Sequence, residues 1–197
     1  MELYHTGFDI IEAPDIHFGR QNADFGQGFY LSGNWEFSVR WARERKGRHT
    51  YLNTYVLDTA GLSIKRFARD AEWFGYIYRN RNGYGYKDSN LYTHTDALAH
   101  YDVLIGPIAN DTIYDIWGIT TSGLLSEAQA LEILSVGPQY EQVVVKSEKA
   151  AAQLHFLSSA VLPHEEIAAQ RAAVSREESA YQDLVGEKLG KIAEILE

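Results

Sequence analysis

His5 and Tyr30 are the two side chains of this sequence whose types and positions best suit ligand chemistry. His5 ends the first apolar run, and Tyr30 closes the glycine-bearing segment Asp24-Phe25-Gly26-Gln27-Gly28-Phe29-Tyr30. A histidine offers two ring nitrogens for hydrogen bonding, and a tyrosine ring stacks on flat ligands. A lone histidine at a strand end is more often structural. The functional interpretation therefore depends on His5 and Tyr30 occurring together within one long motif.

Gln142 is a third candidate, because it lies within the mostly apolar run 141–146. An uncharged polar side chain buried in a strand needs protein partners or a ligand. Glu141, Asp102 and Asp111 supply further carboxylates. Adjacent strand side chains point to opposite faces, so Glu141 and Gln142 cannot both face one cleft without a bulge. For Asp102 we favour a structural role, and for Asn110-Asp111 a helix cap.

Several common catalytic signatures are absent from the sequence. There is no cysteine, which excludes disulfides, cysteine nucleophiles and thiolate zinc sites. Gly26-Gln27-Gly28 lacks the third glycine of a dinucleotide-binding fingerprint and precedes a strand instead of opening a helix. Neither Gly-x-Ser-x-Gly nor His-Glu-x-x-His occurs. These observations exclude a Rossmann site and disfavour the commonest serine hydrolases and zinc proteases, and we expect no metal.

Net charge and hydropathy exclude or disfavour further classes of protein. The 197 residues include 18 Lys and Arg against 27 Asp and Glu, a net charge of −9, so bulk nucleic-acid binding is disfavoured. Hydrophobic residues make up 45% and charged residues 23%, which is typical of a packed globular protein. No apolar run approaches the length of a membrane span, and the amino terminus has no signal-peptide pattern. We expect a cytoplasmic protein with no membrane contact.

Strands and helices are expected to alternate irregularly, which favours an α+β fold over a doubly wound parallel sheet. The long segment between the first two strands, with its glycines and Pro14, is expected to be an ordered loop. Apolar runs predict strands at 2–5, 28–31, 51–57, 101–108 and 141–146. Helical patterns predict helices at 35–47, with Asn34 as its N-terminal cap, and at 68–79, 110–117, from 126 onward and at 147–157.

The sequence changes character at residue 164, which separates a domain at 1–163 from a helical arm at 164–197. The arm is rich in Ala, Glu, Gln and Arg and has too few large apolar residues for a core of its own. We expect it to lie across its own domain through Ile167, Val174 and Tyr181, or to dock on a second copy in a homodimer. An inhibitor such as an antitoxin is a further candidate partner.

The sequence resembles an uncharacterised bacterial family within the ADP-ribosyltransferase-like clan, over about residues 3 to 157. That resemblance implies a split core of two small β-sheets with flanking helices, to which the arm is appended. The motifs that carry it are Leu3-Tyr4-His5, Pro14, Asp24 to Leu31, Trp41-Ala42, Glu72-Trp73, Tyr101-Asp102, Gly106 to Asp111, Gln142 to Val145 and Leu154-His155-Phe156.

The resemblance also implies a site for NAD. In diphtheria toxin and the poly-ADP-ribose polymerases, a His, a Tyr and a third polar residue, often Glu, hold NAD on successive core strands. Carried over to this sequence, His5 hydrogen-bonds a hydroxyl of the adenosine ribose and Tyr30 stacks on the nicotinamide ring. The third catalytic position falls on Gln142.

Neighbouring residues complete the NAD-binding set that the resemblance implies. In the relatives a Gly commonly follows the His directly and offers its backbone to the carboxamide, whereas here Thr6 intervenes before Gly7. Thr6 and Gly7 are both candidates for that contact. Phe29 lies beside Tyr30, and Arg20 in the long loop is a candidate for the pyrophosphate.

These expectations describe a mono-ADP-ribosyltransferase-like enzyme, a transferase that moves ADP-ribose from NAD to an unknown acceptor macromolecule, as a bacterial toxin or effector. Cleavage of the bond to nicotinamide builds positive charge on the ribose, which a Glu would stabilise with a full charge. Gln142 is neither a base nor an anion. The alternative is therefore a catalytically weak or inactive module that binds a nucleotide or a protein.

Overall fold

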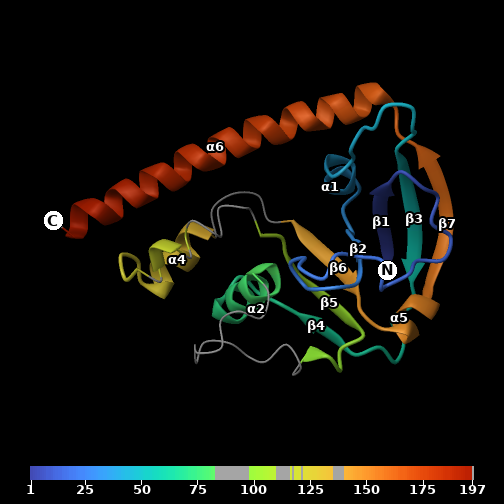
Figure 1. The fold of residues 1–197 in the computed structure, drawn as a ribbon, viewed down its shortest axis with the longest axis horizontal. Helices are drawn as coiled ribbons and strands as arrows, with labels where there is room; N and C mark the ends of the chain where they lie inside the picture. The colour runs from blue at the N-terminus through green and yellow to red at the C-terminus, as the bar shows by residue number, and fades with distance from the viewer. Residues whose placement is uncertain (83–97, 110–115, 117, 121, 135–139, 197) are drawn as a thin grey trace.

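The computed structural model describes all residues except 83–97, 110–115, 117, 121, 135–139 and 197 (Figure 1). Its strands form a three-stranded sheet in the order β1-β3-β7 and a four-stranded sheet in the order β2-β6-β5-β4. The pairings are antiparallel except for β4 with β5, which is parallel. The strands are β1 (Glu2–Gly7), β2 (Phe29–Leu31), β3 (Tyr51–Leu57), β4 (Ile64–Arg66), β5 (Val103–Pro107), β6 (Glu141–Val145) and β7 (Leu154–Val161).

Helices accompany both sheets, so the protein has the α+β class that the sequence predicts. In Figure 1, α2 lies beside the four-stranded sheet and α6 runs along one side of the molecule, with its C-terminal end near α4. The helices are α1 (Trp35–Arg40), α2 (Ala71–Asn82), α4 (Glu127–Leu134), α5 (Glu148–Ala152) and α6 (His164–Leu196). Within the described residues, no helix is both long enough and apolar enough to cross a membrane.

The two sheets are joined by a β-bridge between Tyr4 of β1 and Ser32, directly after β2. The amide of Tyr4 donates to the carbonyl of Ser32 at 2.9 Å, and the amide of Ser32 donates back at 3.0 Å. His5 directly follows Tyr4 on β1, and Tyr30 lies two residues before Ser32 on β2, so both residues are close to this junction.

The four-stranded sheet is buried on both faces because its strand side chains alternate between two cores. Val143 and Val145 face the three-stranded sheet and pack in one cluster with Leu3 and Tyr55. The side chain of Val144 faces the other way, into a cluster that includes Phe25, Trp73 and Ile77. Tyr30 packs against this second cluster. The sheet thus separates the side chains of Phe29 and Tyr30 onto opposite faces.

The helix predicted at 35–47 is shorter than expected. Asn34 caps α1 as the sequence indicates, since its Oδ1 accepts from the amide of Phe37 at 2.8 Å. The helix nevertheless ends at Arg40. Gly47 has φ 77°, a left-handed turn conformation, and lies in a turn closed by the Arg45–Arg48 bridge. The basic residues Arg43, Arg45, Lys46 and Arg48 therefore lie beyond the end of α1, in and beside this turn.

The helix predicted at 147–157 is wrong in its second half. α5 ends at Ala152, and Leu154 begins β7, which pairs with β3. Most β7 side chains are partly or fully exposed, so the segment lacks the apolar alternation that marks a half-buried strand. The short β4 was also missed, and β1 continues beyond His5 to Gly7. The helix predicted at 110–117 lies almost entirely outside the described residues.

Candidate functional site

His5 has a neutral imidazole with one nitrogen committed to the main chain. Its Nδ1 lies 2.8 Å from the carbonyl oxygen of Tyr30. A carbonyl only accepts, so Nδ1 carries the proton. Burial lowers the pKa of His5, and the bond to Tyr30 only partly opposes this shift. The neutral ring therefore keeps a lone pair on Nε2, which has no hydrogen-bond partner within the described part of the chain.

A cavity of about 440 Å³ adjoins this ring, and we call it the His5 cavity. The ring of Phe29 packs against His5 with centroids 4.7 Å apart and forms part of the cavity wall. A Cβ on Gly7 would lie 3.4 Å from His5 Nε2, so the glycine leaves space beside that nitrogen. The remaining lining comes from Gly7, Phe8, Asp9, Ile11, Ala13, Asp15, Phe18, Gly19, Gly28 and Tyr30.

Tyr30 contributes to the same cavity, but its hydroxyl is occupied elsewhere. The hydroxyl donates to the carbonyl of Gly26 at 2.6 Å and accepts from the amide of Phe25 at 2.9 Å. Burial raises the pKa of Tyr30, so the phenol stays protonated. His5 and Tyr30 are therefore brought together through the main chain of β2, while the two rings belong to different faces of the sheet.

Gln142 lies in a buried polar network with Asp24 and Arg81. Its side-chain amide donates to Asp24 Oδ2 at 2.9 Å, and the residue is only 3% exposed. The other oxygen of Asp24 pairs with Arg81 Nε at 2.6 Å. Gln142 is not among the residues that line the His5 cavity. The buried polar side chain that the sequence indicated is thus held by a carboxylate of the loop before β2.

The same loop is clamped by further side chains that the sequence analysis missed. Lys146 Nζ donates to the carbonyl of Phe25 at 2.6 Å and also to that of Gln27. Asn80 donates to the carbonyl of Asp24 at 2.9 Å. Burial lowers the pKa of Lys146 to about 8. These contacts join residues at least 56 positions apart, so no local pattern in the sequence indicates them.

The remaining NAD-binding candidates lie at three different places. Thr6 Oγ1 donates to the carbonyl of Ser38 at 3.1 Å, so its side chain is directed to α1 and away from the His5 cavity. Phe29 is buried, and Gly7 lines the cavity. Arg20 is exposed and lines none of the cavity. The structure therefore brings His5, Gly7, Phe29 and Tyr30 together.

The described carboxylate candidates, Asp102 and Glu141, are engaged in hydrogen bonds or ion pairs with other protein residues. Asp102 accepts from Ser147 Oγ at 2.6 Å and from the amide of Ser63 at 2.8 Å. These hydrogen bonds, that from Ser147 first, lower the pKa of Asp102 to about 2. Glu141 is exposed and pairs with Arg66, on the opposite face of β6 from Gln142. Asp111 lies outside the described residues.

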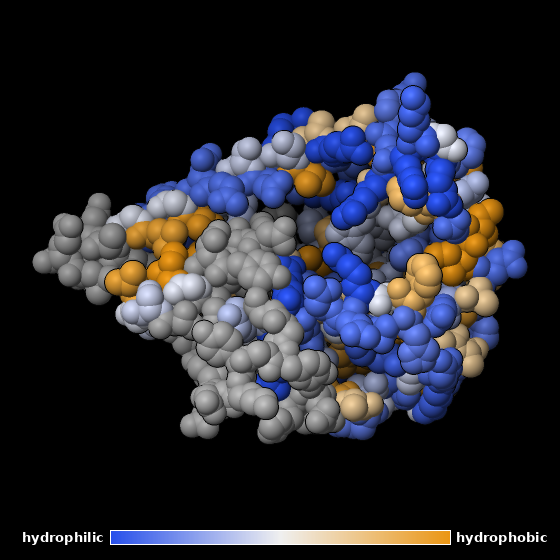
Figure 2. Space-filling view, in the orientation of Figure 1, coloured by the Kyte–Doolittle hydropathy of each residue, from blue (hydrophilic) through white to orange (hydrophobic). Residues whose placement is uncertain are grey.

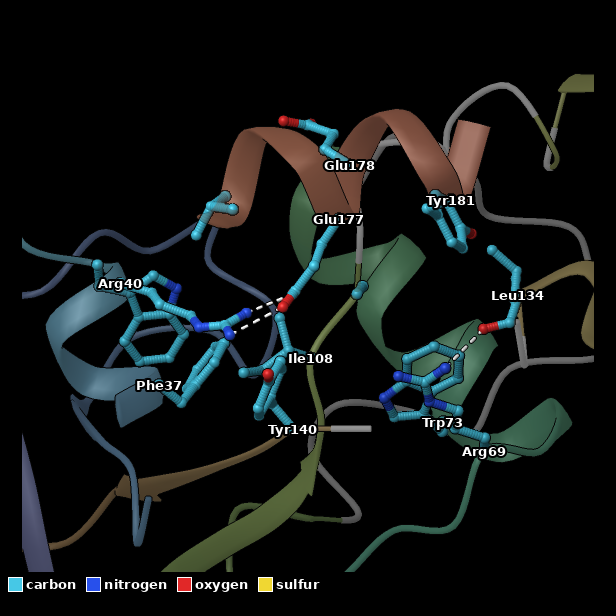
Figure 3. A pocket seen from close by; sticks show the side chains of 13 residues that line it. Phe37, Arg40, Arg69, Trp73, Ile108, Leu134, Tyr140, Glu177, Glu178 and Tyr181 are labelled. Atoms are coloured by element: carbon cyan, nitrogen blue, oxygen red, sulfur yellow. Dashed lines mark hydrogen bonds and ion pairs between the residues drawn. The ribbon is translucent and has the colours of Figure 1, made fainter. Parts of the chain in front are cut away.

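A second cavity of about 290 Å³ lies beneath α6, and we call it the α6 cavity (Figure 3). Phe37, Arg40 and Tyr140 form one side, and Trp73 with Arg69 forms the other. Glu177 and Tyr181 reach down from α6. Ile108 lies between the two sides. The cavity draws on segments far apart in the sequence, and the sequence analysis did not identify it.

Within the described part of the chain, no three or more His, Asp or Glu side chains gather in a group that could hold a metal ion.

The comparisons with known proteins give one family relationship. Neither a curated protein nor a solved structure matches this chain. The family described as a protein of unknown function, DUF3990, matches residues 1–156, which include both sheets up to the first residues of β7. The chain therefore belongs to the DUF3990 family of proteins of unknown function.

Proposed function

We propose that this protein binds NAD in the His5 cavity and acts as a mono-ADP-ribosyltransferase-like enzyme on a macromolecular acceptor. The observation that carries the proposal is the neutral His5 ring beside a cavity of about 440 Å³ at the junction of two small sheets. The split core and the positions of His5 on β1 and Tyr30 on β2 agree with the arrangement expected from the resemblance.

The chemistry of His5 suits a ribose hydroxyl. Nδ1 donates to the Tyr30 carbonyl, so Nε2 is an acceptor that a sugar hydroxyl can reach with its proton. Small-molecule sites usually enclose about 300–1,000 Å³. The His5 cavity therefore suits a nucleoside portion of NAD, and the remainder of the dinucleotide would extend over the surface. Phe29 and the Tyr30 segment supply its apolar wall.

The position of Gln142 favours a second candidate function, a module that binds a nucleotide without turnover. Its amide is engaged with Asp24 and lies outside the His5 cavity, so it offers no anion to a cationic ribose. Two carboxylates, those of Asp9 and Asp15, line the cavity, and Asp9 is paired with Arg48. Asp15 is therefore the carboxylate on which turnover at this site would depend.

The experiment compares binding and turnover in the full chain with matched histidine variants. Calorimetry measures NAD affinity, and NAD labelled on the adenine and on the nicotinamide reports transfer and release. His5→Ala should weaken NAD binding by roughly five- to a hundred-fold, the effect of about 1–3 kcal/mol for one polar contact. His155→Ala, which changes an exposed histidine of β7, is the control and should leave affinity unchanged.

The outcomes separate the candidates. Nicotinamide release or label transfer that His5→Ala abolishes supports the transferase. NAD binding that depends on His5 without release supports the binding module. Equal NAD affinity in wild type, His5→Ala and His155→Ala, with all three folded, would show that the site assignment is wrong.

A further inference from the structure

The α6 cavity has an anion-binding side built around Arg40. The Arg40 guanidinium lies over the Tyr140 ring, 5.1 Å from its centroid, and Tyr140 in turn stacks on Phe37 at 4.3 Å. Arg40 donates to both carboxylate oxygens of Glu177, at 2.9 Å for Oε1. Its side chain is 12% exposed. A stacked, largely buried guanidinium with a bidentate carboxylate is the geometry by which proteins recognise planar anions.

Arg40 retains hydrogen-bonding capacity in this position. Its buried Nε has no hydrogen-bond partner within the described residues. A buried donor without a partner costs free energy, and a ligand acceptor would recover it. The Glu177 side chain is 41% exposed, so water competes with Arg40 for its carboxylate and weakens the ion pair. The ion pair is therefore one that an incoming carboxylate could replace.

The opposite side of the cavity supplies a second aromatic wall. Trp73 is buried, and the Arg69 guanidinium lies 5.9 Å from the centroid of its ring. Arg69 donates to the carbonyl of Leu134 at 2.8 Å, and burial lowers the pKa of Arg69. The void between the walls has a positive guanidinium and an aromatic ring on each side (Figure 3). At about 290 Å³ it is near the lower limit for small-molecule sites.

We propose that the α6 cavity binds a small ligand that carries a planar aromatic ring and one carboxylate, and that Glu177 competes with this ligand for Arg40. The ring would lie between the Tyr140 and Trp73 walls, and the carboxylate would take the place of the Glu177 carboxylate on the Arg40 fork. The α6 cavity shares no lining residue with the His5 cavity, so the proposal does not depend on NAD.

Because Glu177 is a residue of α6, its competition with the ligand for Arg40 makes this helix a part of the binding site. α6 begins at His164, beyond residue 156, where the match to the DUF3990 family ends. Its residues Val174, Glu177, Glu178 and Tyr181 form the roof of the cavity. In Figure 2, hydrophilic side chains cover much of the outer side of α6. The roof is thus an amphipathic helix whose carboxylate holds the cation that a ligand needs.

The test uses 2-naphthoate and its neutral analogue 2-naphthamide as a matched pair of probes for the full chain. Calorimetry measures affinity, and tryptophan fluorescence, to which Trp41 and Trp73 of the cavity lining contribute, follows binding. Glu177→Gln removes the competing charge at nearly constant shape and should tighten naphthoate binding by roughly fivefold or more. Glu165→Gln makes the same change at an exposed residue of α6 that does not line the cavity, and should change the affinity less than twofold.

Arg40→Gln gives the complementary result. It should weaken naphthoate binding roughly tenfold or more and leave naphthamide binding unchanged. Circular dichroism and thermal melting check that each variant is folded. If Arg40→Gln does not fold, the comparison of Glu177→Gln with Glu165→Gln decides. Equal tightening in both glutamate variants, equal affinity for acid and amide, or no naphthoate binding to any folded variant would overturn the proposal.

Discussion

Gln142 and Asp24 are joined by a hydrogen bond of 2.9 Å that ties β6 to the loop before β2. The bond lies on the same face of the sheet as the Tyr30 ring, whose hydroxyl holds Phe25 and Gly26 of that loop. Gln142 and Tyr30 thus both stabilise the segment that forms one border of the His5 cavity. Two residues that the sequence marks for chemistry have a structural role that can be tested separately from any reaction.

Gln142→Glu should destabilise the protein because it sets a second carboxylate against Asp24. The variant replaces a donor by an acceptor, and we expect a loss of about 1–3 kcal/mol in the free energy of unfolding at pH 7. Crowding of two carboxylates raises the pKa of the introduced group in the folded state, so the penalty is present above that pKa and disappears at acid pH. Urea denaturation at pH 7 and pH 4 measures both effects.

Gln142→Met is the matched control, since it removes the hydrogen bond at similar volume without adding a charge. Its loss of stability should be similar at pH 7 and pH 4. If Gln142→Glu is as stable as wild type at pH 7, the amide of Gln142 is not engaged with Asp24.

The protonation state of His5 predicts how NAD affinity depends on pH. The lone pair on Nε2 exists only in the neutral ring, and burial lowers the pKa of His5 below its usual value of 6.5. NAD affinity should therefore stay constant from pH 8 to pH 6.5 and fall at more acid pH, once the ring takes up a proton. Calorimetric titrations across this range provide the measurement. An affinity that rises as the pH falls would mean that a protonated imidazole binds the ligand.

The fold was predicted best where the pattern is local. The strand Tyr51–Leu57 was predicted at its observed bounds because its side chains alternate, and the Asn34 cap was recognised from its position before an apolar helix. β7 was missed, because its existence depends on pairing with β3 about a hundred residues earlier. A short exposed segment takes its conformation from such a partner and not from its own composition.

The candidate site was likewise predictable only where its residues lie close together in the sequence. His5 and Tyr30 lie only 25 residues apart and share one motif, so their proximity could be predicted. The partner of Gln142 lies 118 residues away, and the α6 cavity combines α1, α2, Ile108 and α6. The sequence pattern of each segment, taken alone, indicates only an ordinary core segment or a solvent-exposed helix. The cavity is a product of packing, which a single sequence does not reveal.

Asp102 should stabilise the protein in a manner that acid removes. Its folded pKa of about 2 lies below the ordinary value of 3.8, so its contribution is fully present above pH 4 and is lost as the pH falls toward 2. Asp102→Asn should lower the free energy of unfolding at pH 7 by on the order of 1–2 kcal/mol. Urea denaturation of both proteins at pH 7 and pH 2.5 should show the difference shrinking at the lower pH. A difference that does not depend on pH would contradict the role of its charge.

Gly19 should be intolerant of a side chain because it packs directly on the backbone beside the His5 cavity. A Cβ at Gly19 would lie 2.4 Å from the carbonyl oxygen of Gly28, and both glycines line the cavity. Gly19→Ala must displace the loop and should cost about 1–3 kcal/mol in unfolding free energy, with weaker NAD binding. Gly33→Ala meets nothing within 4 Å and serves as the control. Equal stability of the two variants would mean that the loop does not pack closely on Gly28.

α6 should contribute to stability through its buried side alone. Tyr181 is 6% exposed and belongs to the core cluster that includes Trp73 of α2, whereas Leu184, three residues further along, is 46% exposed. Tyr181→Ala removes a buried ring and should cost roughly 3 kcal/mol or more, while Leu184→Ala should change the free energy of unfolding by less than about 0.5 kcal/mol. Urea denaturation of the full chain compares the two. Equal, small effects would show that α6 does not pack on its own domain in solution, and the Glu177 contact with Arg40 would then need a second chain.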